Sequence, residues 1–202
     1  MRGRLMLVAG CLFVAAPASA QLETIELPDT PEAARYQMGV GFAADARAMV
    51  PPRSRRGDLR KQRWWIERQL RPWLACRRIM NRIARASVFD LYRGQGVLGA
   101  LVQALAATIS MDFARALLRV RAQARQAPVR RLYSAVIDPM LRDAAEGALL
   151  VFARCAHTAE RIRHDAIRDH CIDRAQQLEA DTEVALGADW RPGGGADPHR
   201  HY

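Results

Sequence analysis

Histidine and cysteine side chains recur every seven residues near the C-terminal end of the chain, at His157, His164 and Cys171. Metal ligands on one helix must converge from positions three or four residues apart, and a seven-residue step of about 10.5 Å is too wide. Glu160 and His164 have the closer spacing, but such a pair is more typical of a surface contact. We therefore expect no metal site and no cofactor.

No sequence motif in the chain would assemble a catalytic centre. HExxH, GxSxG, SxxK and CxxC motifs are absent, and so is a glycine-rich phosphate-binding loop. The sequence predicts a protein that acts by binding rather than by catalysis, and it identifies no small-molecule substrate. An enzyme whose site assembles only in the fold stays open as an alternative.

Positive charge is concentrated in one segment. Residues 53–85 contain twelve basic and two acidic residues, a net charge equal to the formal +10 of the whole chain. A focused patch raises the local concentration of anions more than dispersed charge does. Projection of residues 59–91 on a helix of about 100° per residue separates arginines from an apolar stripe. The expected apolar stripe consists of Ile66, Leu70, Trp73, Cys76, Met80, Ile83, Ala84, Val88 and Leu91.

Trp64 projects into the arginine face, whereas Trp65 lies at the edge of the apolar stripe, where core packing explains it. A cationic amphipathic face of this kind can bind phosphate groups through its arginines while tryptophan lies at the level of lipid headgroups. The candidate anion-binding residues are Arg60, Lys61, Arg63, Trp64, Arg68, Arg71, Arg78, Arg82 and Arg85. The alternative is a solvated face, partly paired with an acidic row at Asp165, Asp169 and Asp173.

The expected partner is an anionic lipid, lipopolysaccharide or another envelope polyanion, or an acidic protein surface. Nucleic acid would satisfy the same residues, with Trp64 stacked on a base, but export disfavours it. A structural subunit of an envelope or secretion assembly and a membrane-inserting effector that uses residues 97–111 are the rival functions. Residues 94–111 carry no charge, yet the apolar stripe continues to Val120, which favours a buried bundle helix.

The first twenty residues have the layout of a secretory signal peptide. Two arginines precede an apolar stretch, and Ala18-Ser19-Ala20 ends in a small-x-small cleavage signal. We expect export to the periplasm or the medium, with a mature chain that begins at Gln21. The stretch Val8-Ala9-Gly10-Cys11 resembles a lipobox, so a lipoprotein anchored through Cys11 is the alternative.

Three cysteines remain after Cys11, and an oxidising compartment favours one disulfide among them. Cys155 and Cys171 fall on one predicted helix about 24 Å apart, which is beyond disulfide reach. Cys76 and Cys155 lie at the same level of an up-down-up bundle. We therefore expect a Cys76–Cys155 disulfide and a free Cys171.

Good helix formers dominate the chain and alternating strand patterns are absent. The expected fold class is all-α, a single-domain antiparallel bundle of about four main helices. Thr30 caps a first helix over about 31–50, which Pro51-Pro52 ends. A second helix spans about 58–92 and is kinked or restarted at Pro72.

The third helix spans about 97–125, and a short one follows with Val129, Leu132, Tyr133 and Val136 on one face. Asp138-Pro139 then caps the last and longest helix, which ends at Gly187. The expected organisation is a signal peptide at 1–20, an acidic helix with a Pro/Arg linker at 21–57, a helical bundle at 58–187, and a disordered tail at 188–202.

Overall fold

The computed structural model describes residues 25, 27, 29–54, 58–92, 96–187 and 190. The expected all-α bundle is confirmed. The elements in chain order are α2 (Pro31–Ala48), α3 (Leu59–Trp65), the π-helical turn η1 (Ile66–Leu70), α4 (Arg71–Ser87), the short 3-10 helix η2 (Phe89–Leu91), α5 (Gly96–Arg121), α6 (Ala127–Arg161) and α7 (Asp165–Leu186).

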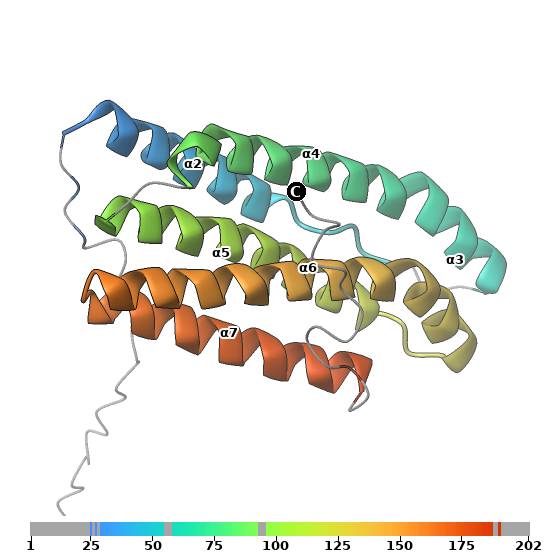
Figure 1. Cartoon of the computed structure of the whole chain (residues 1–202). Helices are drawn as coiled ribbons and strands as arrows, with labels where there is room; N and C mark the ends of the chain where they lie inside the picture. Colours follow the sequence, from blue (N-terminus) through green and yellow to red (C-terminus); the bar gives the residue numbers. More distant parts are fainter. Residues whose placement is uncertain are drawn as a thin grey trace, which may run out of the picture.

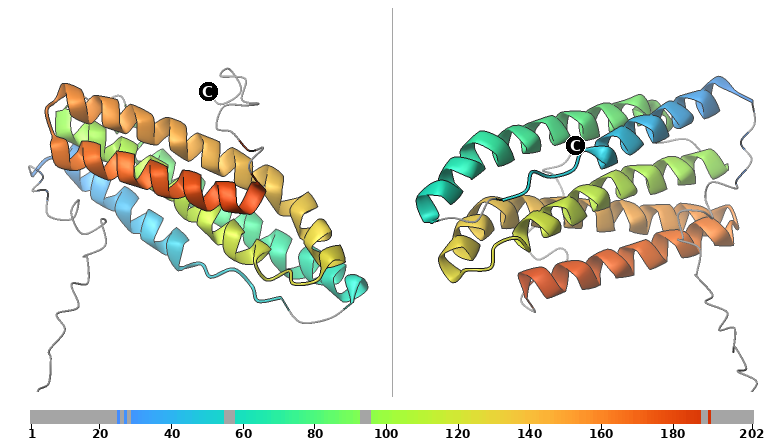
Figure 2. Two further views of the ribbon diagram at one scale, coloured as in Figure 1. Left: turned by 90° about the horizontal axis from the view of Figure 1, so that it is seen from below. Right: turned by 180° about the vertical axis from the view of Figure 1, so that it is seen from behind.

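Helix α5 occupies the centre of the bundle and packs against α2, α4, α6 and α7 (Figure 1). The views in Figure 2 place α2 and α4 on one side of α5, with α6 and α7 on the other. Helix α3, the turn η1 and α4 follow one another without a break and form one long rod. Helix α2 packs on both α4 and α5, so it belongs to the same bundle as the later helices.

The sequence of α5 explains its central position. Apolar residues recur along α5 every three or four positions up to Val120. Leu98 is half-buried, and the following members of this series are buried: Leu101, Leu105, Ile109, Phe113, Leu117 and Val120. Among the described helices, α5 is the one that is long and apolar enough to cross a membrane by length and composition, with a mean hydropathy of 1.6 in its most apolar window. Because 61% of that window is buried between the other helices, its apolar residues serve as core in this fold.

Short polar side chains start the helices at the expected places. The Thr30 hydroxyl accepts a hydrogen bond from the backbone N–H of Ala33 (3.2 Å), and the Asp58 carboxylate accepts one from Lys61 (2.9 Å). Each bond satisfies one of the N–H groups that the first turn of a helix leaves unpaired. Gly187 follows α7 with φ 94°, in the left-handed region that favours glycine.

Helix α2 runs alongside α4 in the opposite direction. Its C-terminal end meets the start of α4, where the Trp73 indole N–H donates to the Met49 carbonyl (3.2 Å). At the other end of α4, a Cβ atom on Gly39, in the middle of α2, would lie only 2.4 Å from Val88 Cγ1. Gly39 is therefore required for the close approach of α2 to the end of α4.

The expected helix start at Pro139 is wrong, because α6 continues through this proline from Ala127 to Arg161. Tyr133 and Ile137 before the proline and Leu141 after it are fully buried. Packing of α6 on α5 therefore holds the helix in place on both sides of Pro139. Pro139 and Ala135, whose carbonyl loses its intrahelical partner, are both exposed. Water can therefore satisfy the carbonyl that the proline ring leaves free.

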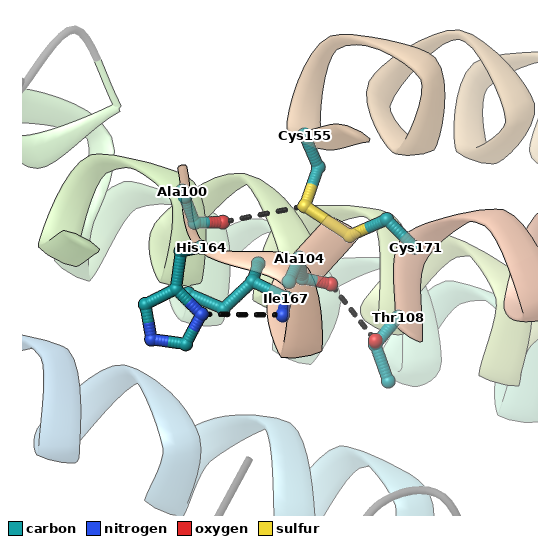
Figure 3. The surroundings of a disulfide bond; sticks show 7 residues. All are labelled: Ala100, Ala104, Thr108, Cys155, His164, Ile167 and Cys171. Atoms are coloured by element: carbon teal, nitrogen blue, oxygen red, sulfur yellow. Dashed lines mark hydrogen bonds between the residues drawn. A yellow bond between two sulfur atoms is a disulfide. The ribbon is translucent and has the colours of Figure 1, made fainter. Parts of the chain in front are cut away.

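The expected single helix over 139–186 is interrupted at residues 162–164. Arg163 adopts a left-handed conformation (φ 57°). The backbone N–H groups of Arg163 and His164 donate to the carbonyls of Glu160 (3.0 Å) and Ala159 (2.9 Å). This is the Schellman arrangement that ends helices, with arginine where glycine is usual. His164 then caps α7, since its Nδ1 accepts from the N–H of Ile167 (3.4 Å, Figure 3).

The turn between α6 and α7 overturns the expected disulfide. Cys155 and Cys171 face each other across this helical hairpin, with their Cα atoms 6.2 Å apart and their sulfurs bonded (Figure 3). Cys76 is a free, exposed cysteine on α4. The Cys76–Cys155 pairing is wrong because it assumed an unbroken helix between residues 155 and 171.

Trp190 also departs from the expected tail at 188–202. Its side chain is buried on the hydrophobic core, and its backbone N–H donates to the Gly187 carbonyl (3.0 Å). The remainder of that tail, the expected signal peptide and Cys11 lie outside the described residues.

We predict that peptide mapping under non-reducing conditions will link Cys155 to Cys171, and that Cys76 will react with a maleimide in the folded protein. Cys171→Ala removes the disulfide that joins two residues 16 positions apart in the chain. It should lower the free energy of unfolding by about 3 kcal/mol, because the unfolded chain is then no longer closed into a loop. A Cys76–Cys155 peptide would contradict the hairpin.

A second prediction concerns the end of α6. Arg163→Gly should raise the free energy of unfolding by about 0.5–1 kcal/mol, because glycine removes the left-handed strain at a modest entropic cost. Arg161→Gly is the matched control. It places glycine within the last helical turn and should destabilise by about 0.5–1 kcal/mol. Urea denaturation measures both, and equal effects at the two positions would contradict the left-handed cap.

Candidate functional site

The candidate face lies on the rod formed by α3, η1 and α4. The backbone widens to π-helical geometry over Ile66–Leu70, which ends two residues before Pro72. A proline ring clashes with the carbonyl four residues earlier in a regular helix, and a wider turn moves that carbonyl away. The sequence indicated a kink or restart here, and the structure shows a widened turn in a continuous rod.

This widened turn changes the side of α4 that meets the core. Five of the nine residues expected on the apolar stripe are buried: Ile66, Leu70, Ala84, Val88 and Leu91. Trp73 and Met80 are half-buried, whereas Cys76 and Ile83 are exposed. Leu74, Arg77 and Asn81 are buried instead. After Pro72 the expected stripe is therefore only partly right: Ala84, Val88 and Leu91 are buried as expected, whereas Cys76 and Ile83 are wrong, because one extra residue in the turn rotates α4 by about 100°.

All nine candidate anion-binding side chains are exposed: Arg60, Lys61, Arg63, Trp64, Arg68, Arg71, Arg78, Arg82 and Arg85. Arg71 forms an ion pair with Glu67 one turn earlier (3.2 Å), and Arg85 donates a hydrogen bond to the Ser110 hydroxyl on α5. Within the described residues, the other candidate arginines have no carboxylate at ion-pair distance. Most of the positive charge on this face is therefore available to a partner.

The acidic row on α7 does not neutralise the face. Asp165 and Asp169 both form ion pairs with Arg168 on their own helix (2.8 and 2.9 Å). Helix α7 packs on α5 and α6, on the opposite side of the bundle from α4 (Figure 2). The solvated-face alternative thus loses the acidic partners that the sequence suggested for it.

The two adjacent tryptophans separate as expected. Trp64 is 59% exposed on the outside of α3, whereas Trp65 is 3% exposed. The Trp65 ring stacks on Tyr133 of α6 with ring centroids 5.6 Å apart, and its indole N–H donates to the Arg53 carbonyl (3.1 Å). Trp65 thus holds the rod to the bundle and leaves Trp64 directed into solvent.

The rotation of α4 places an arginine inside the bundle. The Arg77 side chain is on the side of α4 that packs against other helices, and it is fully buried there. The nearby Asp112 carboxylate forms an ion pair with Arg47 (2.6 Å). Burial lowers the pKa of the Arg77 guanidinium, and Asp112 partly offsets this effect. Within the described chain, Arg77 Nε and Nη1 and Asn81 Oδ1 have no hydrogen-bond partner. The sequence analysis assigned Arg77 neither to the apolar stripe nor to the candidate anion-binding residues, because a charged side chain is seldom expected in a core.

Apolar side chains occupy the outside of α4 in place of Arg77 and Asn81. Ile79 is 56% exposed and Ile83 is 40% exposed, and Cys76 lies one turn before them. Spacings of three and four residues put these side chains on one side of the helix. The sequence projection assigned Cys76 and Ile83 to the core because it assumed a regular helix across Pro72. Only knowledge of the rotation at the widened turn could have corrected this assignment.

Histidine and cysteine do not form a metal centre in the part of the chain that the structure describes, where no group of three potential ligands occurs. His157 lies on α6, His164 in the interhelical turn, and Cys171 is held in the disulfide. Comparison of the chain with protein-family models, curated proteins and solved structures finds no match. Function must therefore be inferred from the side chains themselves.

The two tryptophans give a direct test of this geometry. Trp65→Ala should lower the free energy of unfolding by about 3–5 kcal/mol, as a large aromatic truncation in the core. Trp64→Ala, at the adjacent position, should change it by no more than about 0.5 kcal/mol. Urea denaturation of both variants is the measurement. A Trp64→Ala variant as unstable as Trp65→Ala would mean that Trp64 is a packing residue and not part of a binding face.

Proposed function

We propose that this is an exported helical protein that acts by binding, and that its basic face on α3 and α4 engages anionic components of a cell envelope. Those components are lipid headgroups, lipopolysaccharide or an acidic protein surface. The observation that carries the proposal is the exposure of all nine candidate side chains along one rod, within a segment of net charge +10.

The chemistry of the face supports an anionic partner. Guanidinium groups form paired hydrogen bonds to phosphate and carboxylate oxygens, and they are less strongly hydrated than ammonium groups. Arg78 and Arg82 lie one turn apart on α4, so one extended surface or several headgroups can contact both. Trp64 adds an aromatic ring at the start of the same rod.

The compartment in the proposal is supported by the chain's cysteines and by its first residues. The Cys155–Cys171 disulfide fits an oxidising environment such as the periplasm or the medium. The signal-peptide pattern at residues 1–20 points to the same route.

Among the alternatives, a structural subunit would use the same face to dock on protein, and binding measurements distinguish it. A membrane-inserting effector built on residues 97–111 would have to withdraw α5 from contacts with four other helices. That cost makes α5 a poorer candidate for the binding element than the exposed rod.

Removal of two arginines tests the proposal. The Arg78→Gln/Arg82→Gln variant should bind vesicles of phosphatidylglycerol about thirtyfold more weakly than the parent protein, since each basic residue near an anionic surface contributes about 1 kcal/mol. Binding should also weaken with added salt, because the screening length falls from about 10 Å at 0.1 M to about 3 Å at 1 M. Sedimentation with vesicles gives the affinities.

Arg161→Gln/Arg163→Gln is the matched control. It removes the same charge at the turn between α6 and α7, and it should leave vesicle binding within about twofold of the parent, because these positions lie away from the rod. Equal losses in the two variants would show that net charge alone governs binding. No loss in either would favour the structural-subunit alternative.

A further inference from the structure

An exposed stripe follows the outside of the rod. It consists of Trp64, Pro72, Cys76, Ile79 and Ile83, all of them exposed and hereafter called the outer stripe. One ordinary and one widened helical turn together take up about eight residues, so Trp64 and Pro72 lie on the same side of the rod. The later steps of four, three and four residues keep Cys76, Ile79 and Ile83 on that side.

The core does not use this stripe. Helix α4 packs on α2 and α5 through Leu74, Ala84 and Val88, on the opposite side of the helix. In Figure 1 and in the view from behind in Figure 2, α2 and α5 flank α4 and no described helix covers its outer side. Single exposed apolar residues are ordinary, but Cys76, Ile79 and Ile83 follow one another along the outer stripe with no charged residue between them in the line.

Arginines border the stripe. Arg71, Arg78 and Arg82 follow one edge at steps of seven and four residues, and Arg68 lies within the line between Trp64 and Pro72. A partner that complements this face must therefore be both anionic and able to accept apolar side chains. The surface of an anionic lipid bilayer has both properties, with phosphates at the depth of guanidinium groups and acyl chains just below.

Other partners match less of the face. A soluble polyanion would pair with the arginines and leave Ile79 and Ile83 in water. A second copy of the chain, docked symmetrically through the stripe, would bring two rows of arginines together, and like charges oppose such an interface. The combination of the outer stripe with the arginines along its edge therefore favours an anionic lipid bilayer as the partner.

We infer that the rod lies flat on an anionic bilayer, with Ile79 and Ile83 inserted beneath the phosphates, Trp64 at the headgroup level, and Arg78 and Arg82 bound to lipid phosphates. The inference rests on the proposed function and narrows it to one class of partner, a bilayer surface. It also places Cys76 of the outer stripe next to the bilayer surface, so that a label on its thiol can be used to detect the contact with lipid.

The test compares two pairs of exposed aliphatic side chains. In the full chain, Ile79→Ser/Ile83→Ser should weaken binding to phosphatidylglycerol vesicles by tenfold or more, because two inserted side chains are lost. Leu150→Ser/Val184→Ser changes side chains that are 52% and 89% exposed on α6 and α7, and it should leave binding unchanged. Heparin is the soluble polyanion probe, and its binding should be the same for the parent and both serine variants.

A fluorophore on Cys76 provides an independent measurement. In a chain that carries Cys11→Ser, an environment-sensitive dye on this thiol should shift to shorter wavelength on anionic vesicles and should not shift with heparin. Circular dichroism of every variant should match the parent, because the changed residues are exposed.

The outcomes separate this inference from the proposed function. If the isoleucine variant binds vesicles like the parent while the Arg78→Gln/Arg82→Gln variant is impaired, insertion is wrong and electrostatic binding stands. If the arginine variant is also unimpaired, the proposed function fails as well. A parent protein that sediments as a dimer, and an isoleucine variant that sediments as a monomer, would assign the stripe to a second copy and overturn the lipid assignment.

Discussion

The backbone of the rod widens by one residue at Ile66–Leu70, and this widening sets the register of everything that follows it on α4. Trp65, directly before the turn, faces the core, and after the turn Leu74 and Arg77 do. An unbroken helix would have kept the apolar arc of α4 directed inward. The exposure of the isoleucines and the burial of Arg77 are therefore two results of a single rotation.

Much of the fold could be predicted from local sequence. Thr30, Asp58 and Gly187 end or start helices through contacts within four residues, so their effect does not depend on the rest of the chain. The stripe of α5 could be predicted for a similar reason, because a buried central helix keeps one period over its whole length.

The errors arose where packing overrides local preference. Pro139 signals a helix start, yet buried side chains on both sides of it hold α6 continuous. Arg163 carries no signal for a left-handed turn, so the break that brings Cys155 to Cys171 could not be found from residue types. The same limit applies to the site: exposure of the arginines and Trp64 followed from charge and periodicity, whereas the outward isoleucines depended on a turn geometry that the sequence does not specify.

The orientation of α4 is held at both ends. At the start of the rod, Trp65 stacks on Tyr133, and at the far end the approach of Gly39 to Val88 leaves no room for a different side chain. A rotation that returned the isoleucines to the core would gain about 1.5–3 kcal/mol for each one buried, but it would break both of these contacts. Because the contacts fix the helix before any partner arrives, the outer stripe and the arginine edge are already in place, and little conformational freedom remains to be lost on binding.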